Sequence, residues 1–119
     1  SNAQAWAEQL ATKNQFQHSP AGSPYRSKSH GENITYGRGR ASSLKAMVDR
    51  WGAERQFFRN GTMPNLSTTG NWADVGHYSQ IVWRKTSQLG CGFAKGGQGA
   101  EYLVCQYNPA GNVLGQKPF

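Results

Sequence analysis

The 119-residue sequence predicts a single domain of the α+β class. Helical periodicity occurs in two segments of the first half, whereas two strand-like segments, 88–94 and 101–107, lie near the C-terminal end. Helices and strands that are segregated along a chain, instead of alternating, are typical of this class. A chain of this length also buries enough apolar surface to fold without obligatory disulfides.

Two segments predict helices. Residues 4–15 predict the first, because small, apolar and polar residues recur at helical spacing: Ala7, Leu10, Ala11 and Asn14. The second begins near Ser42 or Ser43, either of which is a suitable N-cap. Its predicted face consists of Leu44, Met47, Val48, Trp51 and Arg55. Glu54 lies at the edge of that face, three residues after Trp51.

Three segments predict irregular structure. Residues 16–40 are rich in proline, glycine and serine, and residues 59–75 form a long polar stretch. The last segment, 108–119, is also rich in glycine and proline. We therefore expect loops around the predicted helices and strands.

The two cysteines flank a predicted hairpin. Residues 96–99 read GGQG, which is typical of a turn, and a hairpin centred near residue 98 places Cys91 opposite Cys105. A disulfide is then geometrically possible, and two buried free thiols are the alternative. We favour the disulfide, which implies an oxidising compartment.

The chain is strongly basic, with 13 Lys and Arg against 6 Asp and Glu and a net charge of +7. Such a charge favours anionic partners, including nucleic acid, anionic lipid or an acidic polymer. The basic residues are scattered from Lys13 to Lys117 in runs no longer than two, which is typical of a solvated surface. Spacing along the sequence leaves open a patch that the fold assembles. No nucleic-acid-binding motif is present, so nucleic acid is not an expected partner.

Targeting signals are sparse. No apolar stretch approaches the roughly 20 residues that a membrane-spanning helix needs, so no transmembrane segment is expected. The opening tripeptide, residues 1–3, is either native or the remnant of a cleaved tag. In the second case, a leader sequence upstream of it has been removed. Three Asn-X-Ser/Thr sequons give weak support to secretion; they begin at Asn33, Asn60 and Asn65.

Four residues are candidates for a divalent metal site. His18 and His77 can each offer an imidazole nitrogen to an ion such as zinc. Glu32 and Glu54 can complete the coordination or orient the imidazoles from behind. No compact ligand motif such as HExxH links these residues, and the third histidine, His30, lies in the predicted loop.

Each candidate also has an ordinary structural interpretation. His18 can interact with the C-terminal end of the first helix, and Glu32 can accept hydrogen bonds from loop amides. Glu54 can pair with Arg50 one turn earlier, and His77 can be a buried, hydrogen-bonded imidazole. Nucleophilic catalysis has little support, because a serine near a histidine in sequence does not make a triad.

Six phrases in fixed order resemble the CAP superfamily, which comprises the cysteine-rich secretory, antigen 5 and pathogenesis-related 1 proteins. The phrases are HS at 18–19, HGEN at 30–33, WGAE at 51–54, GHYSQIVW at 76–83, LGCGFA at 89–94 and YLVCQYNPAGN at 102–112. The resemblance covers nearly the whole chain, 1–119, as a single CAP domain. It implies a three-layer α–β–α sandwich around an antiparallel sheet, in which GHYSQIVW forms a helical turn.

The resemblance also implies a site and a biology. It assigns His18, Glu32, Glu54 and His77 to one cleft, in which the two histidines bind zinc or another divalent ion. It implies a secreted protein, monomeric or weakly dimeric, that binds a sterol or fatty acid in defence or in host–microbe interaction.

Three departures from the family pattern qualify these expectations. The usual first helix is absent before Gln4, so we expect the domain to be N-terminally truncated. Only one cysteine pair is present, which is more similar to microbial or fungal members. Residues 60–71 contain no aromatic residue, so the aromatic-rich loop linked to sterol binding is not clearly matched.

We therefore expect a binding protein more than an enzyme. Two histidine ligands are fewer than the three that are usual at catalytic zinc, which favours a weakly held ion. The alternatives are a metal-dependent hydrolase or peptidase with Glu32 or Glu54 as general base, and a cationic antimicrobial or surface-binding protein.

Overall fold

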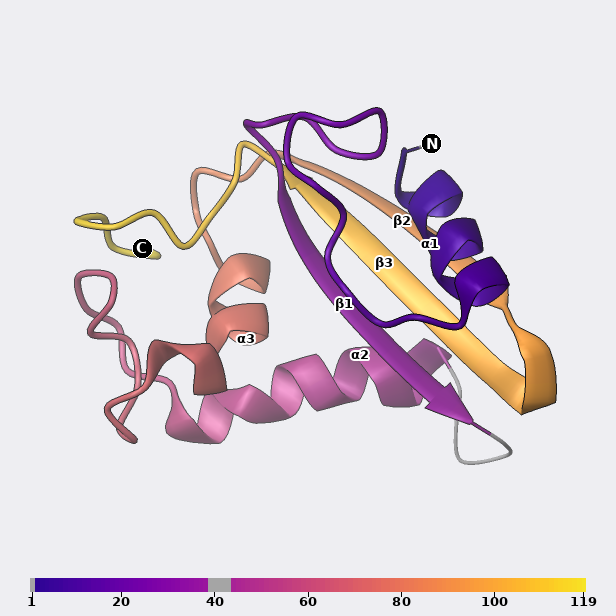
Figure 1. Cartoon of the computed structure of the whole chain (residues 1–119). Coiled ribbons are helices and arrows are strands. Elements are labelled where there is room, and N and C mark those ends of the chain that lie inside the picture. Colours follow the sequence, from indigo (N-terminus) through magenta and orange to yellow (C-terminus); the bar gives the residue numbers. More distant parts are fainter. Residues whose placement is uncertain (1, 39–43) are drawn as a thin grey trace.

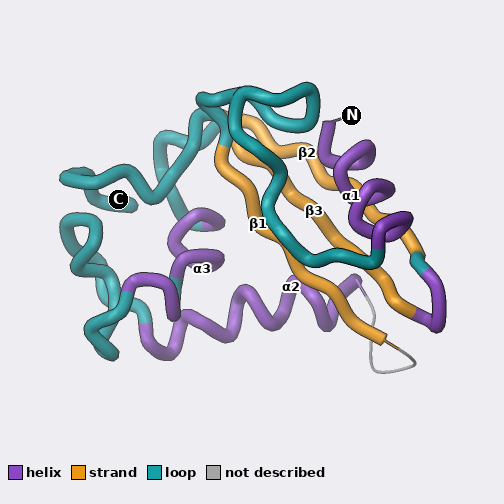
Figure 2. The backbone as a smooth tube through the Cα atoms, viewed as in Figure 1, coloured by secondary structure: helices purple, strands orange, loops and turns teal. Residues whose placement is uncertain are grey.

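The computed structural model describes residues 2–38 and 44–119 and places a sheet between helices (Figures 1 and 2). The strands are β1 (Gly31–Arg38), β2 (Gln88–Lys95) and β3 (Ala100–Asn108). Their order is β1-β3-β2, and both pairings are antiparallel. The helices are α1 (Asn2–Lys13), α2 (Leu44–Ala53) and α3 (Gly76–Ile81).

The sheet is covered on both faces, which confirms the predicted sandwich. Successive side chains of a strand point to opposite faces. One face packs against α1 in a core cluster that includes Ile34, Tyr102 and Val104. The other face packs against α2 through Leu103, Cys105 and Tyr107. Residues 102–107 are therefore buried without interruption, because the central strand β3 has a helix on each side.

Helix α1 forms where its small and apolar residues predict it, shifted by two residues. Ala3, Trp6, Ala7 and Leu10 make the buried stripe. The helix ends at Lys13 because Asn14 adopts a φ of 53°, a left-handed conformation that asparagine tolerates at a helix end.

The predicted apolar face of α2 is only partly correct. Met47 and Trp51, one turn apart, are buried against the sheet, whereas Leu44 is 50% and Val48 44% exposed. The α-helix also gives way to a 3-10 helix at Glu54–Phe57, and this change of pitch leaves Arg55 exposed. The predicted caps, Ser42 and Ser43, lie outside the described residues.

The prediction of a continuous loop over 16–40 is wrong, because β1 lies within it. The residues of β1 are flanked by proline- and glycine-rich sequence, so local composition indicates a loop. Its partner β3 follows some 70 residues later, with Gly31 opposite Tyr107 and Arg38 opposite Ala100. The other two segments are loops as predicted, apart from a short 3-10 helix at Trp72–Asp74.

The predicted hairpin and disulfide are confirmed. Cys91 pairs directly with Cys105 across β2 and β3, with their Cα atoms 4.1 Å apart and an S–S bond of 2.09 Å. The turn uses left-handed conformations at Gln98 (φ 59°) and Gly99 (φ 75°). Within the described residues, no helix is long and apolar enough to cross a membrane.

Gly92 allows α1 to approach the edge strand β2. The Gln4 side chain accepts a hydrogen bond from the Phe93 N–H and donates one to the Phe93 carbonyl, each at 2.9 Å. A Cβ atom on Gly92 would lie 2.3 Å from the Gln4 backbone, whereas one on Gly90 would meet nothing within 4 Å.

Gly92→Ala should therefore lower the free energy of unfolding by about 1–3 kcal/mol, because α1 must move away from the sheet. Gly90→Ala on the same strand is the matched control and should change it by less than about 0.5 kcal/mol. Urea denaturation of both variants measures the difference. Equal effects would contradict this account of α1 packing.

Candidate metal cleft

A cavity of about 210 Å³ lies beside β1, one of the two edge strands of the sheet. Its lining residues come from four parts of the chain: His18, Glu32, Asn33, Trp72, Ala73, Gly76, His77 and Asn112. Glu32 and Asn33 are consecutive in β1, so their side chains leave on opposite faces of the sheet. Of the two histidines that line the cavity, His18 comes from the loop after α1 and His77 comes from α3.

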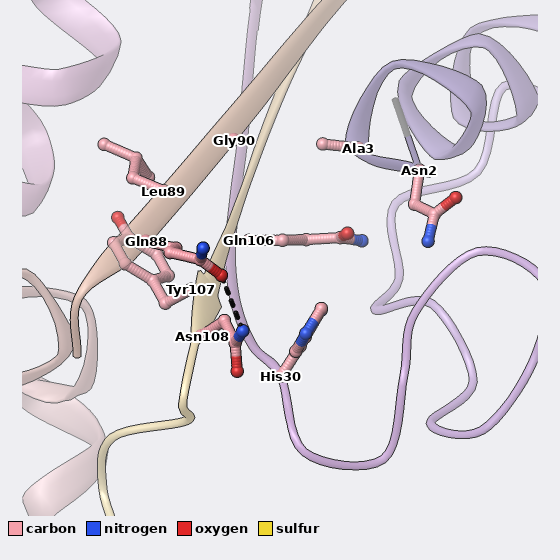
Figure 3. Close-up of a pocket in the computed structure, with 9 residues that line it drawn as sticks. All are labelled: Asn2, Ala3, His30, Gln88, Leu89, Gly90, Gln106, Tyr107 and Asn108. Atoms are coloured by element: carbon pink, nitrogen blue, oxygen red, sulfur yellow. Dashed lines mark hydrogen bonds between the residues drawn. The ribbon is translucent and has the colours of Figure 1, made fainter. Parts of the chain in front are cut away.

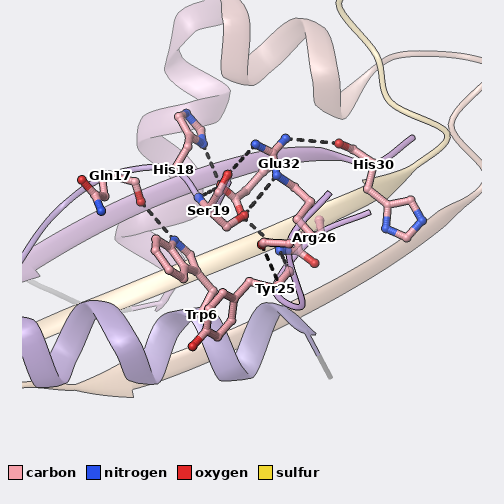
Figure 4. A network of polar contacts seen from close by, with 10 residues as sticks. Trp6, Gln17, His18, Ser19, Tyr25, Arg26, His30 and Glu32 are labelled. Atoms are coloured by element: carbon pink, nitrogen blue, oxygen red, sulfur yellow. Dashed lines mark hydrogen bonds and ion pairs between the residues drawn. The ribbon is translucent and has the colours of Figure 1, made fainter. Parts of the chain in front are cut away.

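The first pair, His18 and Glu32, belongs to a polar network around the buried carboxylate of Glu32, with 55% of the His18 side chain exposed (Figure 4). His18 Nδ1 lies 2.8 Å from Glu32 Oε1, which also accepts the Ser19 N–H at 2.9 Å. Glu32 Oε2 accepts the Ser19 hydroxyl at 2.5 Å and the Gln106 amide at 3.0 Å. Arg26 lies 3.9 Å from Oε2 and also donates to Ser19 Oγ. Every oxygen of the buried carboxylate is therefore compensated.

These contacts keep Glu32 ionised. Burial alone would raise the pKa of the Glu32 carboxyl, but hydrogen bonds from His18, Ser19 and Gln106 together lower its pKa below the usual 4.5. An ionised carboxylate only accepts hydrogen bonds, so the His18 Nδ1 atom carries the proton and donates a hydrogen bond to Glu32.

The second pair, His77 and Glu54, has the same arrangement. His77 Nδ1 lies 2.7 Å from Glu54 Oε2, and Glu54 Oε1 accepts the backbone N–H groups of His77 at 2.9 Å and Tyr78 at 3.0 Å. The His77 ring also stacks on Trp51, with centroids 5.8 Å apart and planes 17° apart. The ring is therefore held at its Nδ1 edge and on one face.

Two asparagines that were not among the predicted site residues hold α3 in place. Asn33 donates from its side-chain amide to the His77 carbonyl at 3.2 Å and to the Tyr107 hydroxyl at 3.1 Å. Asn112 accepts from the Ser79 hydroxyl at 2.5 Å and donates to the Gly76 carbonyl at 2.9 Å. Both asparagines lie within the family phrases HGEN and CQYNPAGN, so the sequence contained a signal that could have identified them. The buried amide of Asn33 also leaves no room for a glycan at its sequon.

The structural alternative for Glu32 is confirmed in part, because Glu32 accepts the backbone N–H of Ser19 in the loop after α1. The alternatives for the other three site residues do not describe their contacts. His18 lies five residues beyond the end of α1 and contacts Glu32 instead of the helix terminus. Arg50 donates to the Tyr36 carbonyl, and Glu54 contacts His77. His77 is only partly buried, with a third of its side chain exposed.

In both pairs a carboxylate contacts Nδ1, so Nε2 is the ring nitrogen that remains available to bind a ligand. Histidines that bind metals typically have this arrangement, in which the carboxylate fixes the tautomer from behind. Among the described residues, no three His, Cys, Asp or Glu side chains form a metal-binding group. The cleft therefore offers two imidazoles, with the glutamates as orienting groups.

The third histidine, His30, lies outside the cleft, in a second cavity of about 240 Å³ (Figure 3). This cavity is lined mainly by uncharged polar side chains, including Gln88, Gln106 and Asn108. Gln106 lines it and donates to Glu32, so the two cavities share one hydrogen-bonded network. Burial raises the pKa of Tyr107, which also lines it, to about 12, so its hydroxyl stays protonated at neutral pH.

The fold and the paired histidines define a small α–β–α sandwich protein with a polar cleft beside its sheet. The family model described as "CAP: Cysteine-rich secretory protein family" matches residues 1–107. The chain belongs to the CAP family, as the sequence phrases predicted.

Its relatives include plant pathogenesis-related and venom proteins. Pathogenesis-related protein 1B of Nicotiana tabacum is 32% identical over 117 residues, which are 98% of this chain and 63% of the relative. Venom allergen 5 of Polybia paulista is 41% identical over 90 residues, covering 71% of this chain and 42% of the relative. The matched part of the chain therefore spans 42–63% of the length of these relatives.

Solved structures share the fold. The structure of BmVAL-1 has a TM-score of 0.70 and 27% identity, covering 99% of this chain and 59% of that chain. A crystal structure of NaASP2 with Zn2+ has a TM-score of 0.65 and 29% identity, covering 98% and 62%.

The pKa of Glu32 predicts how stability depends on pH. Because its folded-state pKa is lowered, the ionised carboxylate stabilises the fold above pH 4.5, and this contribution is lost as pH falls through the lower folded value. Glu32→Gln should remove this part of the acid dependence and cost about 1.5–3 kcal/mol at neutral pH.

Chemical denaturation across acid pH measures both effects. Glu8→Gln, which changes an exposed carboxylate on α1, is the matched control and should cost less than about 0.5 kcal/mol. An unchanged acid slope in Glu32→Gln would contradict the assigned role of Glu32.

Proposed function

We propose that the cleft binds a divalent metal ion, with zinc as the first candidate, through His18 Nε2 and His77 Nε2. The observation that carries the proposal is that two Nδ1-anchored imidazoles line one cavity. The NaASP2 relative, solved with Zn2+, supports the choice of ion. Two protein ligands leave the remaining positions to water, so the ion is exchangeable. When bound, it would polarise a coordinated oxygen atom.

The geometry supports binding better than hydrolysis. The Glu32 side chain is 0% exposed and its oxygens accept four hydrogen bonds. Glu54 likewise uses both oxygens, on His77 and Tyr78. A general base must reach the proton that it abstracts. Glu32 is enclosed by its four hydrogen bonds, and Glu54, although 18% exposed, is not among the residues that line the cavity.

We further propose a secreted protein of the defence or venom type. Its relatives include pathogenesis-related and venom allergen 5 proteins, and the family description is secretory. The Cys91–Cys105 disulfide supports an oxidising compartment, where such bonds form and persist.

A sterol or fatty acid is the small ligand that we propose for the cleft region. Both described cavities, at about 210 and 240 Å³, are smaller than the roughly 300–1,000 Å³ of sites that enclose a drug-sized ligand. A lipid would therefore lie partly on the surface. Trp72 lines the cleft and is 38% exposed, so it offers an apolar wall for such a ligand.

Zinc titration by calorimetry near neutral pH tests the metal site. The wild type should bind saturably, and His18→Ala/His77→Ala should abolish the binding because both Nε2 ligands are gone. Glu54→Gln should weaken it about 10- to 100-fold by releasing the His77 ring.

The chain supplies a matched control in His30, its only other histidine, which lies in the second cavity. His30→Ala should leave zinc affinity unchanged. Loss of binding in His30→Ala but not in the double variant would place the metal elsewhere and refute the cleft assignment.

Titration with a fluorescent fatty acid and with a fluorescent sterol tests the lipid ligand. Trp72→Ala should reduce saturable binding about tenfold, the effect of losing roughly 1.5 kcal/mol of buried apolar contact. Leu44→Ala, which truncates a comparably exposed apolar side chain on α2, is the control and should have no effect. No saturable uptake by the wild type would eliminate the lipid proposal.

A further inference from the structure

Four basic side chains that are scattered in the sequence are brought to one end of the molecule. The segments 58–66, 81–85 and 113–119 join there: the Arg84 N–H donates to the Pro118 carbonyl at 2.8 Å, and the Asn60 amide donates to the Phe119 carbonyl at 2.8 Å. The Met63 N–H donates to the backbone carbonyl of Gln116, also at 2.8 Å. The exposed cations on these segments are Arg59, Arg84, Lys85 and Lys117.

No acidic side chain balances these cations within the three segments. In the part of the chain that the structure describes, none of the four forms an ion pair. The acids nearest in sequence are engaged elsewhere: Glu54 with His77, and Asp74 with the Thr69 hydroxyl. The surface therefore has uncompensated positive charge.

The same three segments also carry exposed apolar side chains. Leu114 is 73% exposed, the largest value among the large apolar residues, and Ile81 and Val113 are 41% and 37% exposed. Met63, Leu66 and Trp83 of these segments form a buried core cluster with Val75, and Phe58 packs against it. The outward residues are thus additional to a packed core. We call this surface, formed by 58–66, 81–85 and 113–119, the basic–apolar end.

The C-terminal tail carries the basic–apolar end at the side of the molecule away from α1 (Figure 1). The last residues of α1 and β2, Lys13 and Lys95, are also exposed cations, but they lie at the opposite end. The protein therefore allows a comparison of two pairs of cations that differ in position and not in charge.

We propose that the basic–apolar end docks on an anionic lipid surface. Cations beside protruding apolar side chains are typical of interfacial membrane binding, in which the charges contact anionic headgroups and the apolar groups enter the headgroup boundary. An acidic polymer in water would use the cations but would give Leu114 no apolar environment. The combination therefore favours a lipid surface over a polysaccharide.

Docking goes beyond the proposed metal cleft and does not depend on it. The two share the C-terminal segment, because Asn112 holds α3 at the cleft and Val113 and Leu114 follow immediately. A small lipid ligand for the cleft region would be encountered at such a surface.

Vesicle co-sedimentation of the wild-type protein tests the docking. Binding should be strong to equimolar phosphatidylcholine and phosphatidylglycerol, weak to phosphatidylcholine alone, and reduced by salt. Arg84→Ser/Lys117→Ser should lower the partition coefficient about 30-fold, since each cation near an anionic surface contributes a factor of about five. Lys13→Ser/Lys95→Ser removes the same charge and should lower it only a few-fold.

The apolar contribution has its own matched pair. Leu114→Ser should lower partitioning to the anionic vesicles, whereas Leu89→Ser, at a 64% exposed site on β2, should not. Circular dichroism and zinc titration of every variant should match the wild type, which separates failure of docking from failure of the fold or of the cleft.

Three results would overturn the proposal. No binding of the wild type to the anionic vesicles would exclude it directly. Equal losses in the two double-cation variants would show that net charge alone drives binding. Binding that is insensitive to Leu114→Ser and equally strong to an anionic polysaccharide would assign the surface to an acidic polymer instead.

Discussion

The antiparallel pairing of β1 with β3 is the constraint on which the cleft depends. In the observed register Glu32 faces Gln106 on the α1 side, and Asn33 faces Cys105 on the α2 side. A shift of one residue would exchange the two faces. Glu32 would then leave Ser19 and His18, and Asn33 would leave the carbonyl of His77. One register therefore determines both halves of the site, although only one of its glutamates lies on a strand.

The two glutamates solve different problems of charge burial. Glu32 is removed from water, and burial of a carboxylate is costly unless hydrogen bonds and nearby cations compensate it. Ser19, Gln106 and Arg26 supply that compensation, so His18 contacts a carboxylate that stays ionised. Glu54 remains partly exposed and is held by two backbone N–H groups at the start of α3. The outcome is the same for both histidines, whose Nδ1 atoms are anchored.

The C-terminal segment connects the cleft with the outer surface. Asn112, with a φ of 56°, turns the chain so that its side chain reaches α3. The residues after it run along 58–66 and past Arg84, and they carry Leu114 and Lys117 outward. A segment without helix or strand thus fixes α3 and builds the basic–apolar end, because its polar backbone groups find partners in other loops.

The sequence alone determined the features that depend on local spacing. Helical periodicity predicted α1, and symmetry about residue 98 predicted that Cys91 faces Cys105, because both signals need only a few neighbouring residues. The order of six phrases identified the family and predicted a cleft of His18, Glu32, Glu54 and His77. His18, Glu32 and His77 line the cavity, and Glu54 contacts His77. The tertiary structure decided the rest: β1, whose partner is distant; the exposure of Leu44 and Val48; and the pairing of His18 with Glu32 and His77 with Glu54. It also decided that cations scattered in the sequence share one end of the molecule. Contacts between distant segments, and not their distance along the sequence, determine which side chains lie close together.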